Sequence, residues 1–396
     1  ATQAGSIDLQ ADRLQVSGLA EILTRSDNAG QAGNITIDVA ESLSIDSTAG
    51  TVQSGVFSTA SGTGAGGNIV ITGGKLVMDG GAVNVSSINF GDAGSITASL
   101  DSVSLQQGAQ ISTSVDGTGQ GGALTVTAVA DVGLDGQASD GFSSGLYSQT
   151  SGSGAGGTVN VSAANVALTD NATISSKSLG TGDAGNVNVT AISSVELDNA
   201  SITTAAANAD GGNIKVTASE LVYLGNSDVS AAVGGGLGNG GNVDIDPQFV
   251  VLSGSNILAS AIGGNGGNIT VVADHFISSP GSVLNASLVS LAERRREVAT
   301  LRTLGYGSWQ IGGLLLRESL LVNLAGTLVG MPIGWLLYFG VTKFHDLDFF
   351  RLPLVASPWV WVATALMSLT FALAAHLVVQ WRIGRLDWLD ALNVLE

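Results

Sequence analysis

Hydrophobic and polar positions alternate along most of the chain, and then the alternation stops. Up to about residue 287, short runs such as 35-ITIDV-39 and 69-IVIT-72 place an apolar side chain at every second position. A period of two predicts strands that have one buried face. Clusters of Gly, Asn, Asp and Ser separate these runs and predict turns. From Ser319 onward the pattern consists instead of two long apolar blocks, which predict a second and different kind of structure.

The alternating runs recur at a nearly constant interval. A Gly-Gly-Asn or Ala-Gly-Asn element opens most copies, as in 32-AGNITIDV-39 and 211-GGNIKVT-217. Two of the intervals are longer than the others, and we attribute their extra residues to the related segments 54-SGVFSTASGTGAGG-67 and 144-SGLYSQTSGSGAGG-157. The last glycine of each opening element lies at position 5, 33, 67, 94, 122, 157, 185, 212, 241 or 267.

Each copy of the repeat contains three short runs, which predict three strands. The first 287 residues are therefore expected to form an all-β parallel β-helix (a β-solenoid) of about ten coils, with Ile, Val and Leu pointing inward. At the strand spacing of about 4.8 Å, the coils would make a rod about 48 Å long. The glycine before each repeated asparagine is expected to adopt a positive φ. The asparagines are expected to form a ladder, in the interior or at a turn, that joins coil to coil: Asn34, Asn68, Asn186, Asn213, Asn242 and Asn268.

Charge divides the chain at about Ser290. Residues 1–290 hold five basic and 24 acidic residues, a net charge of −19, whereas residues 291–396 hold nine basic and eight acidic residues. The acidic first part argues against a nucleic-acid partner, which requires a basic surface. There is no cysteine, which excludes disulfides, a thiol nucleophile and a Cys-based zinc site. Because the chain starts at Ala1 without a signal segment, we expect it to be mature or cut from something longer.

No residue of the repeat region predicts catalysis or a bound cofactor. Arg and Lys are nearly absent there, and a carbohydrate lyase or hydrolase would need them beside its carboxylates. His275 has no partner histidines and is expected at a turn or an edge. Calcium stays open as an alternative to simple Asx turns, because some carboxylates lie in Gly-rich turns, although the calcium-binding nonapeptide is missing. These carboxylates are Asp92, Asp116, Asp183 and Asp210.

The repeat starts GGNI and AGNI and the third runs GAQIS, NATIS and NASIT give residues 1–287 a family resemblance. They resemble the β-helical repeats of filamentous-haemagglutinin-like bacterial proteins, which are secreted by the two-partner route. This resemblance implies an exported, rod-shaped adhesin or surface filament, whose place would be the cell surface or the extracellular space.

The two apolar blocks, residues 319–341 and 352–381, predict a transmembrane hairpin. Each is longer than the roughly 20 residues that cross the hydrocarbon of a bilayer. Arginines precede the first block and follow the second, so both ends of the hairpin are expected in the cytoplasm and the loop 342–351 outside. Glycines spaced four apart predict a helix-packing face, although membrane helices also tolerate glycine without such a role. These glycines are Gly326, Gly330 and Gly334.

Residues 288–318 predict an amphipathic helix on the cytoplasmic face, and 382–396 a cytoplasmic tail. The segment 291-LAERRREVATLRTLGYGSWQI-311 and the tail RIGRLDWLDALNVLE resemble the C-terminal region of FtsX-like ABC transporter permeases, in the bacterial inner membrane. The resemblance implies that a separate ATPase subunit binds this stretch, since the chain has no GxxxxGK[ST] motif of its own. The implied coupling residues are Glu293, Arg294, Arg295, Arg296, Glu297, Leu301 and Gly305.

Three classes of function remain open at this point. The first is a non-catalytic transport component, in which part of a permease carries an adhesin-like solenoid. The second is a surface adhesin with a membrane anchor, and the third is a solenoid carbohydrate enzyme. Residues 276–292 could end the solenoid or be a remnant of a permease helix, and the join could be a natural fusion or an artefact.

Overall fold

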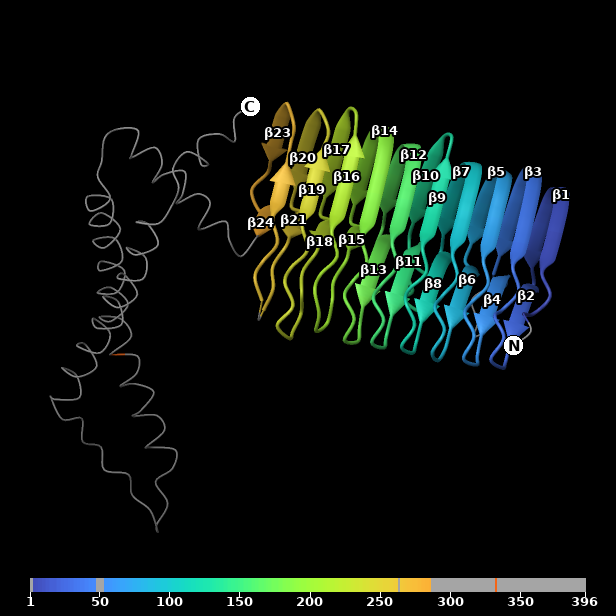
Figure 1. The fold of residues 1–396 in the computed structure, drawn as a ribbon. Coiled ribbons are helices and arrows are strands. Elements are labelled where there is room, and N and C mark those ends of the chain that lie inside the picture. Colours follow the sequence, from blue (N-terminus) through green and yellow to red (C-terminus); the bar gives the residue numbers. More distant parts are fainter. Residues whose placement is uncertain (1–2, 48–52, 263, 286–331, 333–396) are drawn as a thin grey trace, which may run out of the picture. The chain divides into compact units, whose positions relative to one another are not determined.

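A computed structural model describes residues 3–47, 53–262, 264–285 and 332 of the chain (Figure 1). The chain divides into two units, Ala1–Val289 and Ser290–Glu396. Every described strand belongs to the first unit, which is a parallel β-solenoid. The predicted parallel β-solenoid is thereby confirmed over the described residues between 3 and 285.

Two parallel sheets run along the solenoid, and each coil contributes to both. The larger sheet contains β1 (Ile7–Ser17), β3 (Ile35–Asp46), β5 (Ile69–Asp79), β7 (Ile96–Gln106), β9 (Leu124–Ala128), β10 (Asp131–Asp135), β12 (Val159–Thr169), β14 (Val187–Asp198), β16 (Ile214–Ala218), β17 (Leu221–Gly225), β19 (Val243–Asp246), β20 (Phe249–Ser253), β22 (Ile269–Val271) and β23 (His275–Ser278). The smaller sheet contains β2 (Glu21–Ser26), β4 (Gly55–Ala60), β6 (Ala82–Ser87), β8 (Gln110–Val115), β11 (Gly145–Thr150), β13 (Thr173–Ser178), β15 (Ser201–Thr203), β18 (Asp228–Ser230), β21 (Asn256–Leu258) and β24 (Val283–Asn285). One strand of the smaller sheet per coil gives ten coils.

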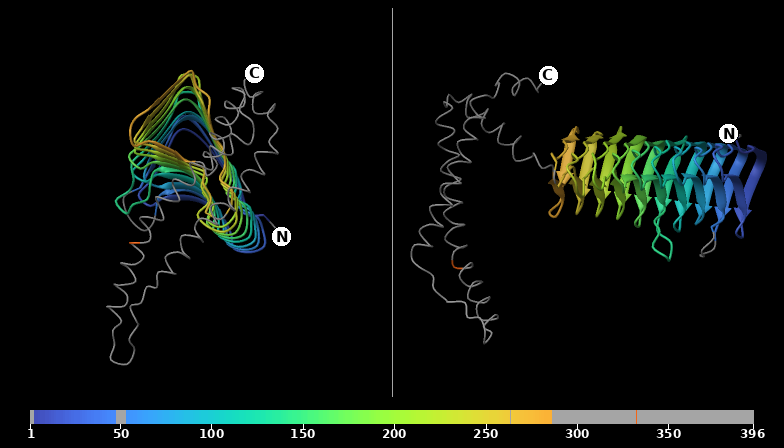
Figure 2. Two further views of the ribbon diagram at one scale, coloured as in Figure 1. Left: turned by 90° about the vertical axis from the view of Figure 1, so that its left-hand side faces the viewer. Right: turned by 60° about the horizontal axis from the view of Figure 1, so that its bottom comes forward.

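The first two predicted runs of each coil belong to one sheet. In six coils they form one long strand, such as β3 or β14, and in four they form two strands, such as β9 and β10. The pairing register shifts within the long strands, for example between Val39 and Ser42, where an irregularity bends the strand. The bend and the turns give the coil a three-sided outline when the solenoid is viewed along its length (Figure 2). The sequence periodicity predicted three runs per coil. It did not predict that the first two runs join into one strand in most coils.

The core consists of columns of like apolar side chains, one from each coil. Parallel in-register pairing places Met78 of β5 on Leu105 of β7, and Leu105 on Leu134 of β10. These side chains are between 0 and 1% exposed to solvent. Because each coil repeats the same inward positions, the apolar surface of one coil is covered by its neighbours. This column runs through Val16, Ile45, Met78, Leu105, Leu134, Leu168, Leu197, Leu224 and Leu252.

The glycine before each ladder asparagine is needed for close approach and not for an unusual φ. The expectation of a positive φ was wrong, because the glycines with positive φ lie elsewhere in the described chain, such as Gly80 and Gly81. A Cβ at Gly212 would instead fall 1.8 Å from the carbonyl oxygen of Gly185, and one at Gly241 1.9 Å from that of Gly212. The same stacking makes a continuous column, called here the glycine column: Gly5, Gly33, Gly67, Gly94, Gly122, Gly157, Gly185, Gly212, Gly241 and Gly267.

The extra residues of the two long repeats fall in the connections from the larger sheet to the smaller one. Gly80 and Gly81 alone connect β5 to β6, whereas residues 47–54 connect β3 to β4 and residues 136–144 connect β10 to β11. The SGVF and SGLY segments, to which we attributed the insertions, are instead ordinary strands β4 and β11. They occupy equivalent positions in the smaller sheet, each as the strand that follows a longer connection.

The tenth coil includes residues that the sequence left open between a strand and a membrane helix. Residues His275–Ser278 form β23, which pairs with β20, and Val283–Asn285 form β24, which pairs with β21. Both pairings are parallel and continue the register of the coils before them. The described part of 276–292 therefore belongs to the solenoid.

Candidate functional site

The six repeated asparagines lie at the corner where each coil enters its first strand. The side-chain oxygen Oδ1 of Asn186 accepts a hydrogen bond from the backbone N–H of Asn213 at 2.8 Å, and Oδ1 of Asn213 accepts one from Asn242 at 2.9 Å. Asn34 and Asn68 make the same contact at 2.9 Å, as do Asn242 and Asn268. All six side chains are half-buried or exposed, so the ladder lies at a turn and not in the interior.

The ladder is interrupted where other residues replace asparagine. Ser95, Ala123 and Thr158 occupy the position in the three middle coils, between Asn68 and Asn186. The backbone N–H of Ser95 still donates to Oδ1 of Asn68 at 2.8 Å, but the row then stops. The asparagines therefore form two separate ladders, and their contacts are structural.

Removing one acceptor from the longer ladder gives a first testable effect. We expect Asn213→Ala to lower the free energy of unfolding by about 1 kcal/mol, because the Asn242 N–H loses its partner. Asn213→Asp keeps an oxygen at that position and is expected to be milder. Amide hydrogen exchange at Asn242 measures the change. Equal protection in the alanine variant and the unmodified chain would show that the ladder contributes nothing.

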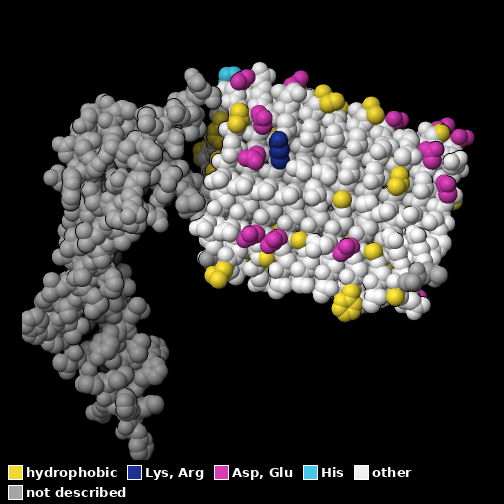
Figure 3. All heavy atoms as spheres, viewed as in Figure 1, with side chains coloured by type: hydrophobic (Ala, Val, Ile, Leu, Met, Phe, Trp, Pro, Cys, Tyr) yellow, Lys and Arg dark blue, Asp and Glu magenta, His cyan; other side chains and the backbone are white. Residues whose placement is uncertain are grey.

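The turn carboxylates accept hydrogen bonds from the next coil. Oδ1 of Asp183 accepts from the Asp210 N–H at 3.0 Å, and Oδ1 of Asp210 accepts from the Asn239 N–H at 2.7 Å. Asp92 accepts the N–H of Gln120 at 2.7 Å, and Asp116 the hydroxyl of Ser151 at 3.1 Å. Among the residues that the structure describes, no three carboxylates or histidines gather where they could hold a metal ion. Acidic side chains are spread over the face of the solenoid in Figure 3 rather than collected in one place.

A row of buried hydroxyls links the smaller sheet to the glycine column, and sequence analysis missed it. The hydroxyl of Ser58 donates to the carbonyl of Gly33 at 3.0 Å and accepts from the N–H of Gly67 at 3.0 Å. Ser148 does the same with Gly122 and Gly157. The only signal in the sequence is a Ser or Thr at an inward position where the alternation calls for Val or Ile. The row comprises Thr24, Ser58, Thr113, Ser148, Ser176 and Thr204.

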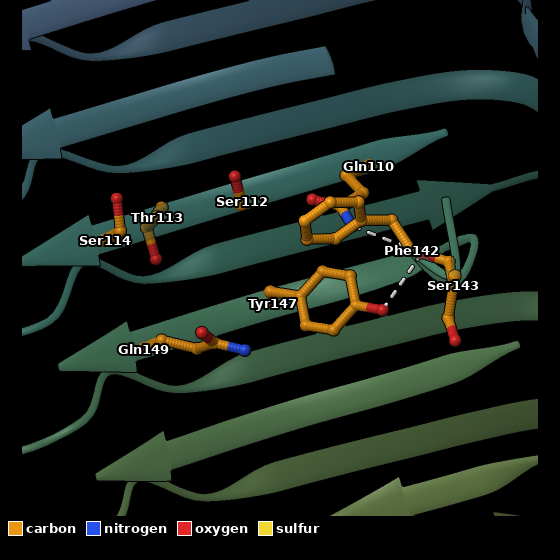
Figure 4. Close-up of a pocket in the computed structure, with 9 residues that line it drawn as sticks. Gln110, Ser112, Thr113, Ser114, Phe142, Ser143, Tyr147 and Gln149 are labelled. Atoms are coloured by element: carbon orange, nitrogen blue, oxygen red, sulfur yellow. Dashed lines mark hydrogen bonds between the residues drawn. The ribbon is translucent and has the colours of Figure 1, made fainter. Parts of the chain in front are cut away.

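The outer face of the smaller sheet carries a pocket of about 330 Å³ beside the loop 136–144. The loop is closed by hydrogen bonds from Ala138 N–H to Phe142 O at 2.7 Å and from Gly141 N–H to Ala138 O at 2.9 Å. Tyr147 donates its hydroxyl to Ser143 O at 3.1 Å, which ties the loop to β11. In Figure 4 the rings of Phe142 and Tyr147 lie beside one another, and both are seen face-on. The pocket is lined by Gln110, Ser112, Thr113, Ser114, Gly141, Phe142, Ser143, Tyr147 and Gln149.

Burial raises the pKa of Tyr147 to about 12 from 10.0, and hydrogen bonds with Thr173 and Ser143 offset only part of that rise. The neutral phenol is therefore favoured in the folded protein. A raised pKa means that the phenol's contribution to stability is intact below pH 10 and is lost as the pH rises through about 12.

Titration of the phenol tests the burial of this ring. The difference in phenolate absorbance between the unmodified chain and Tyr147→Phe should have its midpoint near pH 12. Retained β-type circular dichroism over the same range is the control for folding. A midpoint near 10 in the folded protein would mean that the ring is open to solvent.

His275 begins β23 and is exposed, with its ring stacked on Phe249 at a centroid distance of 4.9 Å. It is therefore an edge residue, as expected. The predicted coupling residues Glu293–Glu297, Leu301 and Gly305, and the predicted packing glycines Gly326, Gly330 and Gly334, lie outside the described residues. Within residues 3–47, 53–262 and 264–285 and at 332, no helix is long and apolar enough to cross a bilayer.

Comparison with known proteins finds one family model that matches the end of the chain. Residues 277–387 match the model of the FtsX-like permease C-terminal family. No curated protein and no solved structure matches the chain. The match starts at Ile277, inside β23, so residues 277–285 belong both to the matched region and to the last coil of the solenoid.

Proposed function

We propose that this chain is a non-catalytic membrane component of an ABC transporter, in which an FtsX-like permease region carries a β-solenoid. The observation that carries the proposal is the family match over residues 277–387. It coincides with the two apolar blocks, 319–341 and 352–381, that are long enough to span a bilayer.

The length of chain between the solenoid and the arginines supports one arrangement across the membrane. The last described strand ends at Asn285, and Arg294 begins the basic cluster. The eight residues between them would span about 12 Å as a helix, far less than the hydrocarbon thickness of about 30 Å. An extended segment would leave its backbone unpaired in lipid. Because arginines near a span favour the cytoplasm, the solenoid is proposed to lie on the cytoplasmic side.

The partner of the permease region would be a separate ATPase subunit. Before the first apolar block the sequence places charged and apolar residues that would contact this subunit: Glu293, Arg294–Arg296, Glu297, Leu301 and Gly305. In this proposal these residues receive the ATPase, and movement passes from them to the membrane helices. The residues perform no chemistry themselves.

Cross-linking tests the proposed partner. The chain has no cysteine, so Leu301→Cys provides a single site for a photoactivatable cross-linker in native membranes. The expected product contains a protein with a GxxxxGK[ST] nucleotide-binding motif, and Lys215→Cys on the solenoid is the matched control. A product from Leu301→Cys that never contains a nucleotide-binding protein would contradict the proposal.

An adhesin is the second candidate, and the solenoid fold itself favours it. Its ten coils form a regular parallel stack, which suits a surface filament. In that case the apolar blocks would act as an anchor, and the solenoid would lie outside the cell. Membrane sidedness separates the two candidates.

A further inference from the structure

We infer that the pocket on the smaller sheet binds a neutral saccharide chain. The inference depends on the solenoid alone and goes beyond the proposed transport role. Four features of the outer face carry it: aromatic platforms, amide and hydroxyl groups, the absence of charge in the lining, and continuity along the rod.

The aromatic rings lie where a sugar ring could stack on them. Phe142 is 58% exposed at the tip of its loop. The Tyr147 ring packs against Gly145. A Cβ built on Gly145 would lie only 2.9 Å from Cε2 and Cζ of the ring. The missing side chain lets the ring lie against the strand, beside the ring of Phe142 (Figure 4). The C–H face of a sugar is apolar and suits such a platform, because aromatic faces carry negative potential.

Polar groups surround the rings at the places where sugar hydroxyls would need partners. Gln110, Ser112 and Ser114 of β8 and Gln149 of β11 line the pocket with amides and hydroxyls. Each amide offers both donors and an acceptor, as a sugar hydroxyl requires. A concave site with aromatic walls and a few converging polar groups is the usual form of a small-ligand site, and 330 Å³ is at the lower end of their size range.

The lining carries no charged side chain, which argues for a neutral ligand. The nearest charges lie at its margins and have opposite signs. Asp140 is in the loop, where Oδ1 accepts from the Phe142 N–H at 3.3 Å, and Lys177 pairs in register with Gln149. The solenoid as a whole is strongly acidic, which disfavours anionic polysaccharides.

A second platform indicates a chain rather than a single sugar. Phe57 of β4 covers Gly55 as Tyr147 covers Gly145, with Cζ 2.8 Å from the place of the missing Cβ. The register places Asn84 and Ser112 between Phe57 and Tyr147 on the same row, and Asn84 Nδ2 donates to Ser112 Oγ at 2.7 Å. Three strand spacings separate the two rings, about 14 Å along the rod. A saccharide of several units could contact both.

The test is binding of neutral hexasaccharides of glucose, mannose and N-acetylglucosamine to the full chain in lipid nanodiscs, measured by calorimetry. Maltoside detergents are avoided because they are saccharides. We expect at least one hexasaccharide to bind, and Phe142→Ala to weaken it by about tenfold. Phe90→Ala is the matched control, because Phe90 is 66% exposed in a different loop.

Three results would overturn the inference. One is that none of the three hexasaccharides binds, and another is that Phe142→Ala and Phe90→Ala bind equally well. The third is that alginate, an anionic chain, binds at the pocket and neutral chains do not. Failure here leaves the transport proposal intact, because cross-linking at Leu301→Cys does not involve this pocket.

Discussion

Leu105→Ala is expected to lower the free energy of unfolding by about 2–5 kcal/mol. Leu105 is fully buried in the middle of an apolar column, between Met78 of the coil before it and Leu134 of the coil after it. Truncation leaves a cavity that three coils share, and regular stacking gives the neighbouring backbone little freedom to close it. Urea unfolding followed by β-type circular dichroism measures the loss.

A leucine outside the core is the matched control. Leu237 is 84% exposed, so Leu237→Ala should change stability by less than about 0.5 kcal/mol. If both variants unfold at the same urea concentration, the apolar columns are not what stabilises the solenoid. Hydrogen exchange would show whether the damage spreads, because a repeat fold transmits it through neighbouring interfaces.

Gly212→Ala is the second large effect, and we expect a loss of about 1–3 kcal/mol from overpacking. The added methyl would fall 1.8 Å from the carbonyl oxygen of Gly185, which is backbone and cannot rotate away. The two coils would have to separate locally. Increased hydrogen exchange at Asn213, whose N–H bonds to Asn186 across the same interface, reports that separation.

Gly133→Ala separates this steric effect from the general effect of replacing glycine in a strand. Gly133 lies in β10, and the nearest atom to a Cβ there is Val103 O at 4.0 Å. Its φ is not positive, so alanine fits without strain and stability should hold or rise slightly. A destabilisation equal to that of Gly212→Ala would argue against the stacking role of the glycine column.

The fold was predictable because its cause is periodic. Alternation at period two and recurrence of the glycine column give the inward faces, the coil count and the solenoid class directly. The sequence did not show why glycine occupies these positions, because a positive φ and a close approach of two backbones both favour glycine. Only the structure distinguishes the two causes, because a Cβ on any glycine of the column after Gly5 would fall 1.8–2.1 Å from a carbonyl oxygen of the preceding coil.

The pocket was not predictable for a related reason. Gly145 and Tyr147 are two residues apart in a strand, and the sequence does not show that one covers the other. Phe142 reaches the same face through a loop whose position was misassigned by several residues. Serine and threonine at inward positions, such as Ser58 and Ser148, also look like breaks in the pattern until their bonds to the glycine column are seen.

Residues 277–285 show why the two parts of the chain are difficult to separate by pattern. With Phe276 before it, this stretch reads 276-FISSPGSVLN-285, which has enough apolar residues for the end of a membrane helix and enough alternation for two short strands. The structure assigns it to β23 and β24, because the register with β20 and β21 continues. The family match begins at Ile277 and includes these residues. Their sequence therefore resembles a permease, while their structure belongs to the solenoid.

The central proposal is that one chain joins a solenoid to a membrane hairpin and keeps the solenoid on the cytoplasmic side. Labelling of single cysteines in spheroplasts with a membrane-impermeant maleimide tests it most directly, because the unmodified chain has no cysteine. Lys343→Cys, in the loop between the apolar blocks, should label in intact spheroplasts. Lys215→Cys, exposed on β16, should label only after the membrane is permeabilised. Labelling of Lys215→Cys in intact spheroplasts, as readily as Lys343→Cys, would contradict the account.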